Sequence, residues 1–252
     1  MNLLKKLSPI ILIAVIVAIW EATVQIMDIP MYVLPAPSDT IKIFFSDFGT
    51  LASNAAVTLG EAFAGIGISF VIAVVIGILM DTFPLMRQCI YPILVVTQTV
   101  PVIVLAPIFI IYLGFGLAPK ILTVVLMCFF PVVVSFSDGM SQIDEKYTNL
   151  LKSYGGSRLQ LYAMVKIPSA MISLLSGLKV AATYSISGAV VGEWIASERG
   201  LGYYLIRAKN LYMLDKVFAC VLMIVCLSLL MNGLVKLIHY IAIPSERRVK
   251  SV

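Results

Sequence analysis

Long apolar runs constrain this chain more than any other feature of its sequence. Each run approaches or exceeds the roughly 20 residues that a helix needs to cross the hydrocarbon core of a bilayer. Hydrophobic residues make up 61% of the sequence and charged residues only 12%, so most of the chain is expected to lie in lipid. The six predicted spans are Pro9 to Met27, Thr58 to Met80, Ile90 to Tyr112, Ile121 to Asp138, Met171 to Trp194 and Val217 to Ile243.

These runs predict helices rather than a transmembrane barrel. Barrel strands alternate polar and apolar residues over segments of about 10 residues, whereas these runs are continuous. The predicted fold class is therefore all-α, a polytopic membrane protein with about six transmembrane helices, with residues 1–252 as a single transmembrane domain. The first run follows Lys5 and Lys6 but lacks a small-residue cleavage site, so we expect a retained helix rather than a signal peptide.

The distribution of basic residues predicts the orientation in the membrane. If the N-terminus is cytoplasmic, eleven lysines and arginines fall inside and six outside, as the positive-inside rule favours. The inside set is Lys5, Lys6, Arg87, Lys146, Lys152, Arg158, Lys166, Lys236, Arg247, Arg248 and Lys250, and the outside set is Lys42, Lys120, Arg199, Arg207, Lys209 and Lys216. Both termini are therefore expected in the cytoplasm, and the net charge of +5 is attributed to topology rather than to nucleic-acid binding.

Several kinds of chemistry are excluded by the residues present. The cysteines have no metal-type spacing and are expected to be packing residues, and the single histidine, His239, cannot alone build a metal site or a catalytic relay. The Gly155-Gly156 pair lacks the lysine and hydroxyl of a phosphate-binding loop. We therefore expect no catalytic residue, no metal and no bound cofactor in this chain, which is not predicted to be an enzyme. The four cysteines are Cys89, Cys128, Cys220 and Cys226.

Four charged residues fall inside or at the rims of the predicted spans. They are Glu21, Glu61, Lys179 and Glu193. An ionised group in a bilayer is costly unless it is paired or hydrated, so these side chains are expected to face protein or water. An ion-coupled secondary carrier stays open as an alternative class, although the sequence has neither a bank of buried acids nor a convincing inverted repeat.

Spans two to four are rich in residues that disturb regular helix packing. Small residues let helices approach closely, and prolines free backbone carbonyls that can line a cavity. A substrate pathway is therefore expected near Thr97, Gln98, Thr99 and Pro101. The alternative is that these residues provide only kinks and packing contacts.

On the outer side, Pro35 and Pro37 are expected to end one helix, with Ser38 or Asp39 capping a short amphipathic one.

One long hydrophilic segment, Ser141 to Ser169, interrupts the apolar sequence. Its apolar residues recur at near-helical spacing, are interrupted at Gly155-Gly156 and stop at Pro168, which predicts two short helices with a bend. An apolar face with basic flanks suits docking in a groove of another protein. An amphipathic helix resting on the membrane surface is the alternative.

The spacing in this segment carries a family resemblance. Gly155 is followed thirteen residues later by Pro168, within Val165-Lys166-Ile167-Pro168. This resembles the EAA loop of permease subunits of bacterial binding-protein-dependent ABC importers, in which Glu-Ala-Ala, three residues, Gly, nine residues and Ile-x-Leu-Pro follow in order. Further matching segments are LPAPS at Leu34 to Ser38, QTVPVIVLAP at Gln98 to Pro107, YLGFG at Tyr112 to Gly116, FFPVVV at Phe129 to Val134, GLKVA at Gly177 to Ala181, GEW at Gly192 to Trp194 and GLG at Gly200 to Gly202.

The resemblance implies that residues 141–169 form a cytoplasmic coupling loop of the EAA type. The chain departs from the pattern where Asn149-Leu150-Leu151 replaces Glu-Ala-Ala, which removes a carboxylate that can contact a partner. The residues implied to dock an ATPase are Asn149, Leu151, Gly155, Ser157, Arg158 and Pro168.

The resemblance also implies partners and a cargo. An importer of this kind contains two permease copies, expected here as a homodimer, two ATPases that hold ATP and magnesium, and an extracytoplasmic substrate-binding protein. Gly188 to Asn210 resembles permeases for hydroxymethylpyrimidine or formylaminopyrimidine precursors of thiamine. The expected pathway residues are Gln98, Thr99, Pro101, Tyr184 and Glu193. Import of sulfonates, taurine or nitrate stays open as the alternative. The expected location is the bacterial cytoplasmic membrane.

Overall fold

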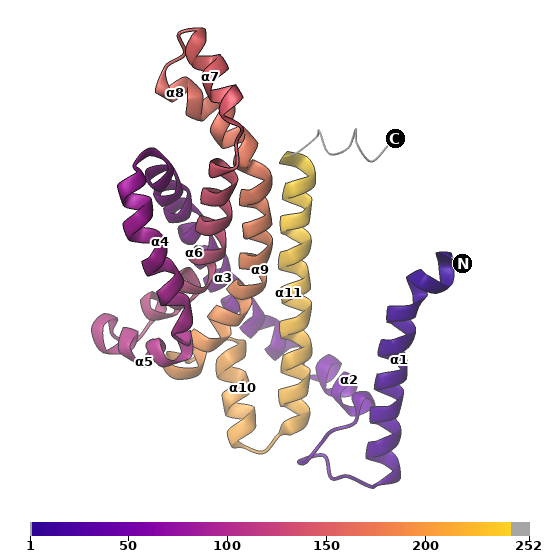
Figure 1. The fold of residues 1–252 in the computed structure, drawn as a ribbon. Helices are drawn as coiled ribbons and strands as arrows, with labels where there is room; N and C mark the ends of the chain where they lie inside the picture. The colour runs from indigo at the N-terminus through magenta and orange to yellow at the C-terminus, as the bar shows by residue number, and fades with distance from the viewer. Residues whose placement is uncertain (1, 243–252) are drawn as a thin grey trace.

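The computed structural model describes residues 2–242, which form helices joined by short connections and contain no β-strand. The all-α prediction is therefore confirmed. In chain order the elements are α1 (Asn2–Ile26), α2 (Pro37–Ser46), α3 (Phe48–Thr82), α4 (Pro84–Thr99), α5 (Val102–Leu113), α6 (Leu117–Ser141), α7 (Glu145–Ser153), α8 (Arg158–Leu161), the π-helix η1 (Tyr162–Lys166), α9 (Ile167–Ala196), α10 (Leu201–Asn210) and α11 (Leu214–Ala242) (Figure 1).

Five of the predicted spans correspond to helices that are long and apolar enough to cross a membrane. These helices are Leu7–Ile26, Phe48–Thr82, Leu117–Ser141, Arg158–Ile195 and Leu214–Ala242. Several exceed the roughly 20 residues that a bilayer requires. Helices of this length cross a bilayer by tilting or by continuing past the hydrocarbon region.

The third predicted span, Ile90 to Tyr112, is not a continuous helix. The structure divides it into α4 and α5, whose axes differ in direction by 102°. The break falls at Val100, which is extended (φ −84°, ψ 119°), immediately before Pro101. A proline disfavours helical geometry in the residue before it and cannot donate a backbone hydrogen bond. Pro101 therefore lies at a turn of slightly more than a right angle in this apolar run.

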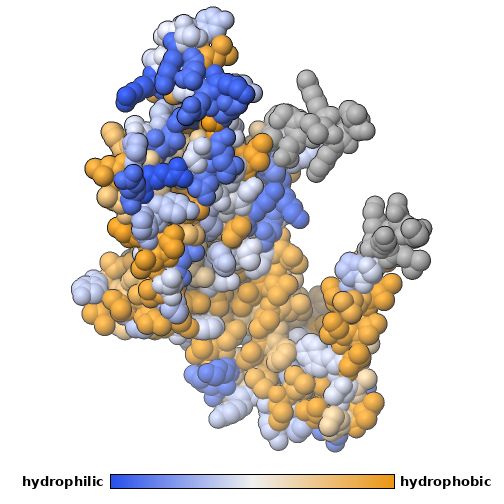
Figure 2. Space-filling model, in the orientation of Figure 1, coloured by the Kyte–Doolittle hydropathy of each residue, from blue (hydrophilic) through white to orange (hydrophobic). Residues whose placement is uncertain are grey.

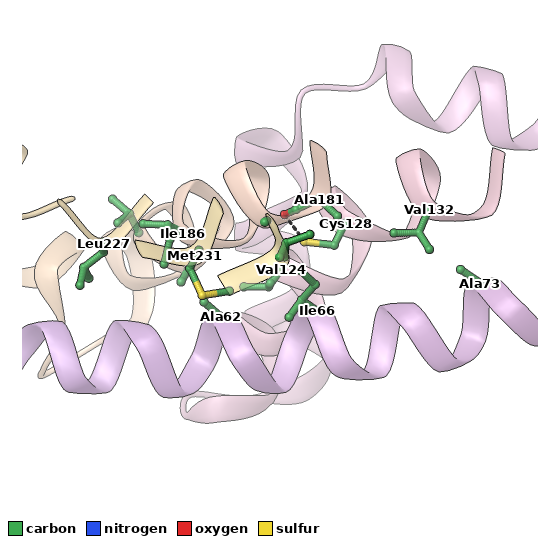
Figure 3. Close-up of a cluster of buried hydrophobic side chains, with 14 of the residues drawn as sticks. Ala62, Ile66, Ala73, Val124, Cys128, Val132, Ala181, Ile186, Leu227 and Met231 are labelled. Carbon is green, nitrogen blue, oxygen red and sulfur yellow. Dashed lines mark hydrogen bonds between the residues drawn. The ribbon is translucent and has the colours of Figure 1, made fainter. Parts of the chain in front are cut away.

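The core lies between α3, α6 and α9. Figure 3 shows Ala62, Ile66 and Ala73 of α3 on the side that faces α6. Cys128 of α6 is fully buried there, and its Sγ donates to the backbone oxygen of Ala181, 3.3 Å away. Close approach requires Gly65, because a Cβ at that position would collide with the side chain of Val124. Small residues thus bring the helices together as the sequence predicted.

The connection from α1 to α2 is capped differently from the prediction. Pro37 begins α2 instead of ending a helix, and Ala36 is the N-cap residue without a side-chain cap. The carboxylate of Glu21 on α1 accepts hydrogen bonds from the Ser38 backbone N–H at 3.0 Å and from the Ser38 hydroxyl at 2.8 Å. Proline suits the first position of a helix, and a carboxylate satisfies a free N–H there. Glu21 thus takes the capping role predicted for Ser38 or Asp39.

The molecule has two ends of different composition. Figure 1 shows α7 and α8 projecting from one end, and α10 with the α1–α2 connection at the other. The start of α1 and the end of α11 point toward the end that carries α7 and α8. Figure 2 shows hydrophilic residues gathered over α7 and α8, with a largely hydrophobic surface below them. Ser141 to Ser169 is thus the hydrophilic projection that its composition predicted.

Candidate functional site

The projection consists of two short helices with well-defined caps. The Asp144 carboxylate accepts from the Lys146 backbone N–H at 2.9 Å and caps α7. Ser157 and Gln160 form a capping box at the start of α8. Between these helices Gly155 has a φ of +76°, a region that side chains other than glycine rarely adopt. The bend predicted at Gly155-Gly156 is therefore present.

Pro168 does not stop the second helix, contrary to the prediction. It lies in the first turn of α9, and Arg158–Ile195 runs as one helical unit of 38 residues. The π-helix η1 immediately precedes it, with the Ile167 backbone N–H donating to the oxygen of Tyr162. A wider π-turn relieves the clash between a proline ring and the carbonyl one turn earlier. Helix α8 therefore continues directly into a helix that is long enough to span a membrane.

The projection exposes large apolar side chains to solvent. Tyr154 is 83% exposed and Leu159 is 79% exposed. Asn149, Ser157 and Arg158 are also exposed, whereas Leu151 is half-buried and lies against Gly156. Exposed apolar side chains on a hydrophilic segment are typical of a protein-binding surface. Leu151 packs under the turn, and Tyr154 and Leu159 form the exposed apolar surface.

The break between α4 and α5 opens a cavity of about 480 Å³ against α6 and α9. Of the predicted pathway residues, Gln98, Pro101 and Tyr184 line it, together with Thr97. Thr99 is exposed and is not among the lining residues; its hydroxyl donates to the Val96 oxygen at 2.7 Å. The remaining lining residues are Val100, Val102, Leu105, Leu126, Met127, Phe129 and Phe130.

Glu193 lies apart from this cavity, in a buried polar cluster near α10. It is 1% exposed, and its carboxylate accepts from the Thr58 hydroxyl at 2.7 Å and from the Gly202 backbone N–H at 2.6 Å. The Thr58 hydroxyl in turn accepts from the Leu201 backbone N–H at 2.9 Å. Side chains of α3 and α9 thus satisfy the free N–H groups at the start of α10.

Lys120 completes this cluster and was not identified from the sequence as a site residue. Its Nζ lies 2.5 Å from Glu61 Oε1 and 3.1 Å from the Ser197 hydroxyl, and the side chain is 8% exposed. The sequence predicted Lys120 among the basic residues on the outside. An available signal was Glu61, since an acid inside a span needs a basic partner. Lys179, the cation expected inside or at the rim of a span, is half-buried, with Nζ 2.9 Å from His239 Nδ1.

A second polar contact fastens α10 at the same end. The Tyr204 hydroxyl donates to the Asp47 carboxylate at 2.6 Å, and Lys216 Nζ lies 3.8 Å from the same carboxylate. Burial raises the pKa of Tyr204, and the hydrogen bond to Asp47 raises it further. Asp47, at the junction of α2 and α3, therefore contacts both α10 and the start of α11.

Comparison with known proteins assigns the chain to a family of membrane proteins. The chain matches the profile of the family described as "Binding-protein-dependent transport system inner membrane component" over residues 69–240. The protein belongs to this family. It is therefore a multi-pass inner membrane permease of an ABC importer, a transport subunit rather than an enzyme.

Individual relatives support the same assignment. The formylaminopyrimidine transport permease protein ThiX of Halalkalibacterium halodurans is 31% identical over 248 residues, covering 97% of this chain and 98% of the relative. The taurine transport system permease protein TauC of Escherichia coli is 28% identical, covering 87% of this chain and 82% of the relative.

A solved structure shows the same fold. A structure of the methionine ABC transporter MetNI, described as inward facing, contains a chain that superposes with a TM-score of 0.69 at 17% identity. The match covers 77% of this chain and 97% of that chain.

Family membership decides against the ion-coupled carrier, and it implies an ATPase and a substrate-binding protein as partners.

Proposed function

We propose that this permease imports a small, uncharged aromatic solute of the thiamine pyrimidine precursor type, hydroxymethylpyrimidine or formylaminopyrimidine. The observation that carries the proposal is the lining of the cavity at the α4–α5 break. Among the residues that the structure describes, that lining contains no charged side chain. Gln98, Thr97 and Tyr184 supply polar groups, and Phe129 and Phe130 supply aromatic surface.

The chemistry of this lining favours a pyrimidine over an anion. Aromatic side chains stack on flat rings, and an amide can both donate to and accept from ring nitrogens and amino groups. A sulfonate or nitrate is held best by charge-assisted hydrogen bonds from lysine or arginine, which this lining lacks within the described residues. The similarity to ThiX points the same way, and the similarity to TauC keeps taurine as the second candidate.

In this proposal Glu193 has a structural role and does not contact the solute. Its two oxygens already accept hydrogen bonds from Thr58 and Gly202. Gln98, Pro101 and Tyr184 are the proposed pathway residues, whereas Thr99 lies beside the pathway. Specificity rests mainly on the binding protein, because a permease that held its cargo tightly in both conformations would release it slowly.

The α7–α8 projection is the proposed ATPase-docking surface. It presents Asn149, Ser157 and Arg158 around exposed apolar side chains, and Leu151 and Gly155 support its shape. Two ATPases would hold ATP and magnesium, and this chain would bind no cofactor of its own. ATP-driven closure of the ATPases would then move α8 and the continuous helix that follows it, which alternates access to the cavity.

Two copies of this chain are proposed to form the complete pathway, because one copy provides only one wall of a central pore. The docking surface is placed in the cytoplasm, with both termini on the same side. Lys146, Lys152 and Lys166 follow the positive-inside rule in that orientation. The predicted inside residues Arg247, Arg248 and Lys250 lie outside the described residues.

The proposed cargo is tested by ATP hydrolysis in the reconstituted permease, ATPase and binding protein. We expect hydroxymethylpyrimidine or formylaminopyrimidine to stimulate hydrolysis and taurine to leave it unchanged. Gln98→Ala should reduce pyrimidine uptake, whereas the control Thr99→Val should retain it because Thr99 does not line the cavity. Stimulation by taurine alone would overturn the pyrimidine assignment and leave the importer class intact.

A further inference from the structure

The docking projection is fastened to the bundle at one small polar cluster. Asp81, the penultimate residue of α3, receives two side chains from the projection. Lys166 Nζ lies 2.5 Å from Asp81 Oδ2, and the Tyr162 hydroxyl donates to the same oxygen at 2.7 Å. The hydroxyl of Thr82 donates to the Tyr162 oxygen at 2.8 Å. These three contacts join the first and last residues of η1 to the end of α3.

This cluster is shielded from solvent and geometrically specific. The side chain of Asp81 is 8% exposed and that of Lys166 is 19% exposed. Lys166 Nζ also lies 5.3 Å from the centre of the Tyr162 ring, within range of a cation–π contact. Charge-assisted hydrogen bonds in such surroundings are stronger than those between exposed groups.

The two residues that reach Asp81 are the first and last residues of the π-helix η1. A π-turn is rare and is seldom retained without a functional or packing reason. Relaxing it to regular α-helix would shift the register by one residue. That shift rotates α8 by about 100° relative to α9. The contacts to Asp81 therefore bear directly on which way the docking surface faces.

We propose that Asp81 is a positioning residue for coupling, which holds the π-turn in register and makes α3 move together with the docking helices. The inference rests on the proposed docking function of α7 and α8. The first mechanical connection is the continuity of α8 with α9. The contacts to Asp81 add a second one, to α3. Motion of the docked surface would then reach two membrane-spanning helices at once.

A suitable control lies at the same end of the bundle. Arg87 Nη2 and Asp138 Oδ1 are 3.4 Å apart and join α4 to α6. Their side chains are 36% and 38% exposed, and neither belongs to Glu145–Ser169. Asp138→Asn therefore removes a carboxylate of the same type without touching the proposed connection.

The test compares Asp81→Asn, Asp81→Glu and Asp138→Asn in the full complex of permease, ATPase and binding protein. Three quantities are measured: retention of the ATPase on purification, hydrogen exchange of the Tyr162–Lys166 amides, and stimulation of MgATP hydrolysis by the binding protein. With Asp81→Asn we expect the ATPase to be retained, exchange to rise about tenfold, as weaker hydrogen bonds from Lys166 and Tyr162 to an uncharged side chain imply, and stimulation to be lost.

The other variants sharpen this test. Asp81→Glu keeps the charge and should restore part of the stimulation, and Asp138→Asn should behave as the unmodified protein. If Asp81→Asn does not fold, Lys166→Met supplies the same comparison from the other side of the ion pair. Unchanged exchange and stimulation in a folded complex would overturn the positioning role. Failure of the unmodified permease to retain the ATPase would instead overturn the docking function and the inference with it.

Discussion

At the residue scale, the buried cluster around Lys120 shows how a membrane-spanning chain tolerates charge. Lys120 faces Glu61 at 2.5 Å, and both side chains are less than 10% exposed (8% and 3%). The second acid, Glu193, is held by Thr58 and Gly202 instead. Each of the two acids thus has at least one ion-pair or hydrogen-bond partner, although Glu61 Oε2 is buried without a hydrogen bond. The cluster ties α3, α6 and α9 to the start of α10.

Removing Lys120 should therefore destabilise the protein strongly. In Lys120→Met the carboxylate of Glu61 stays buried without its cation, which costs on the order of 3 kcal/mol. We expect a clear fall in the midpoint of thermal unfolding in detergent. Lys216→Met is the control, because its 3.8 Å pair with Asp47 is 37% exposed on the lysine side and is expected to contribute about 1 kcal/mol at most.

A double variant checks the cause of that effect. Lys120→Met combined with Glu61→Gln removes both charges and should unfold at a higher temperature than Lys120→Met alone, because no unpaired carboxylate remains. Equal melting of Lys120→Met and Lys216→Met would contradict the assigned importance of the buried pair.

At the element scale, the shape of the α7–α8 projection depends on the turn between these two helices. Gly155 adopts a φ of +76°, and a Cβ there would meet no atom within 4 Å. Any penalty for a side chain at this position therefore comes from the backbone conformation and not from a collision. The capping box at Ser157 and Gln160 fixes the helix that follows. The turn thus sets the angle between α7 and α8.

Gly155→Ala should weaken ATPase association without unfolding the bundle. A non-glycine residue in the left-handed region costs about 1 kcal/mol, and the projection can avoid that cost by changing its shape. Binding of purified ATPase to the variant measures the effect, with an expected loss of about fivefold. Gly67→Ala is the control, since Gly67 also has open space but lies within α3. Equal binding by both variants would show that the turn does not shape the docking surface.

At the scale of the whole molecule, the two ends of the helix bundle are the basis of the orientation proposed for the chain in a bilayer. α7 and α8 form one end, and α10 with the α1–α2 connection forms the other (Figures 1 and 2). The long helices run between these ends. The proposed orientation places α7 in the cytoplasm and α10 outside, and it therefore predicts opposite accessibility for the two ends.

Single cysteines test this orientation. After Cys89 and Cys226, the exposed native cysteines, are replaced by serine, Lys152→Cys on α7 and Lys209→Cys on α10 are introduced separately. Both side chains are exposed. A membrane-impermeant maleimide should label the cysteine at position 209 in intact spheroplasts and the one at position 152 only after permeabilisation. The reverse pattern would overturn the assignment of both termini to the cytoplasm.

Much of this architecture was predictable because apolar length and local turn chemistry are properties of short segments. Five of the six predicted spans correspond to helices suited to crossing a membrane, and the bend at Gly155 follows from glycine's tolerance of positive φ. The broken third span was not predicted, although Pro101 carried the signal. A proline within an apolar run is compatible with a kink or with a reversal, and the surrounding packing decides between them.

The sequence by itself determined the fold class, the hydrophilic projection and the family resemblance, because hydropathy and motif spacing are written along the chain. The tertiary structure alone decided which polar groups meet. Lys120 and Glu61 are 59 positions apart, and Lys166 and Asp81 are 85 apart. Such pairs form only when helix packing brings distant positions together, since no local pattern encodes which buried charge faces which partner. For the same reason, only the fold showed that Glu193 lies outside the cavity that Gln98, Pro101 and Tyr184 line.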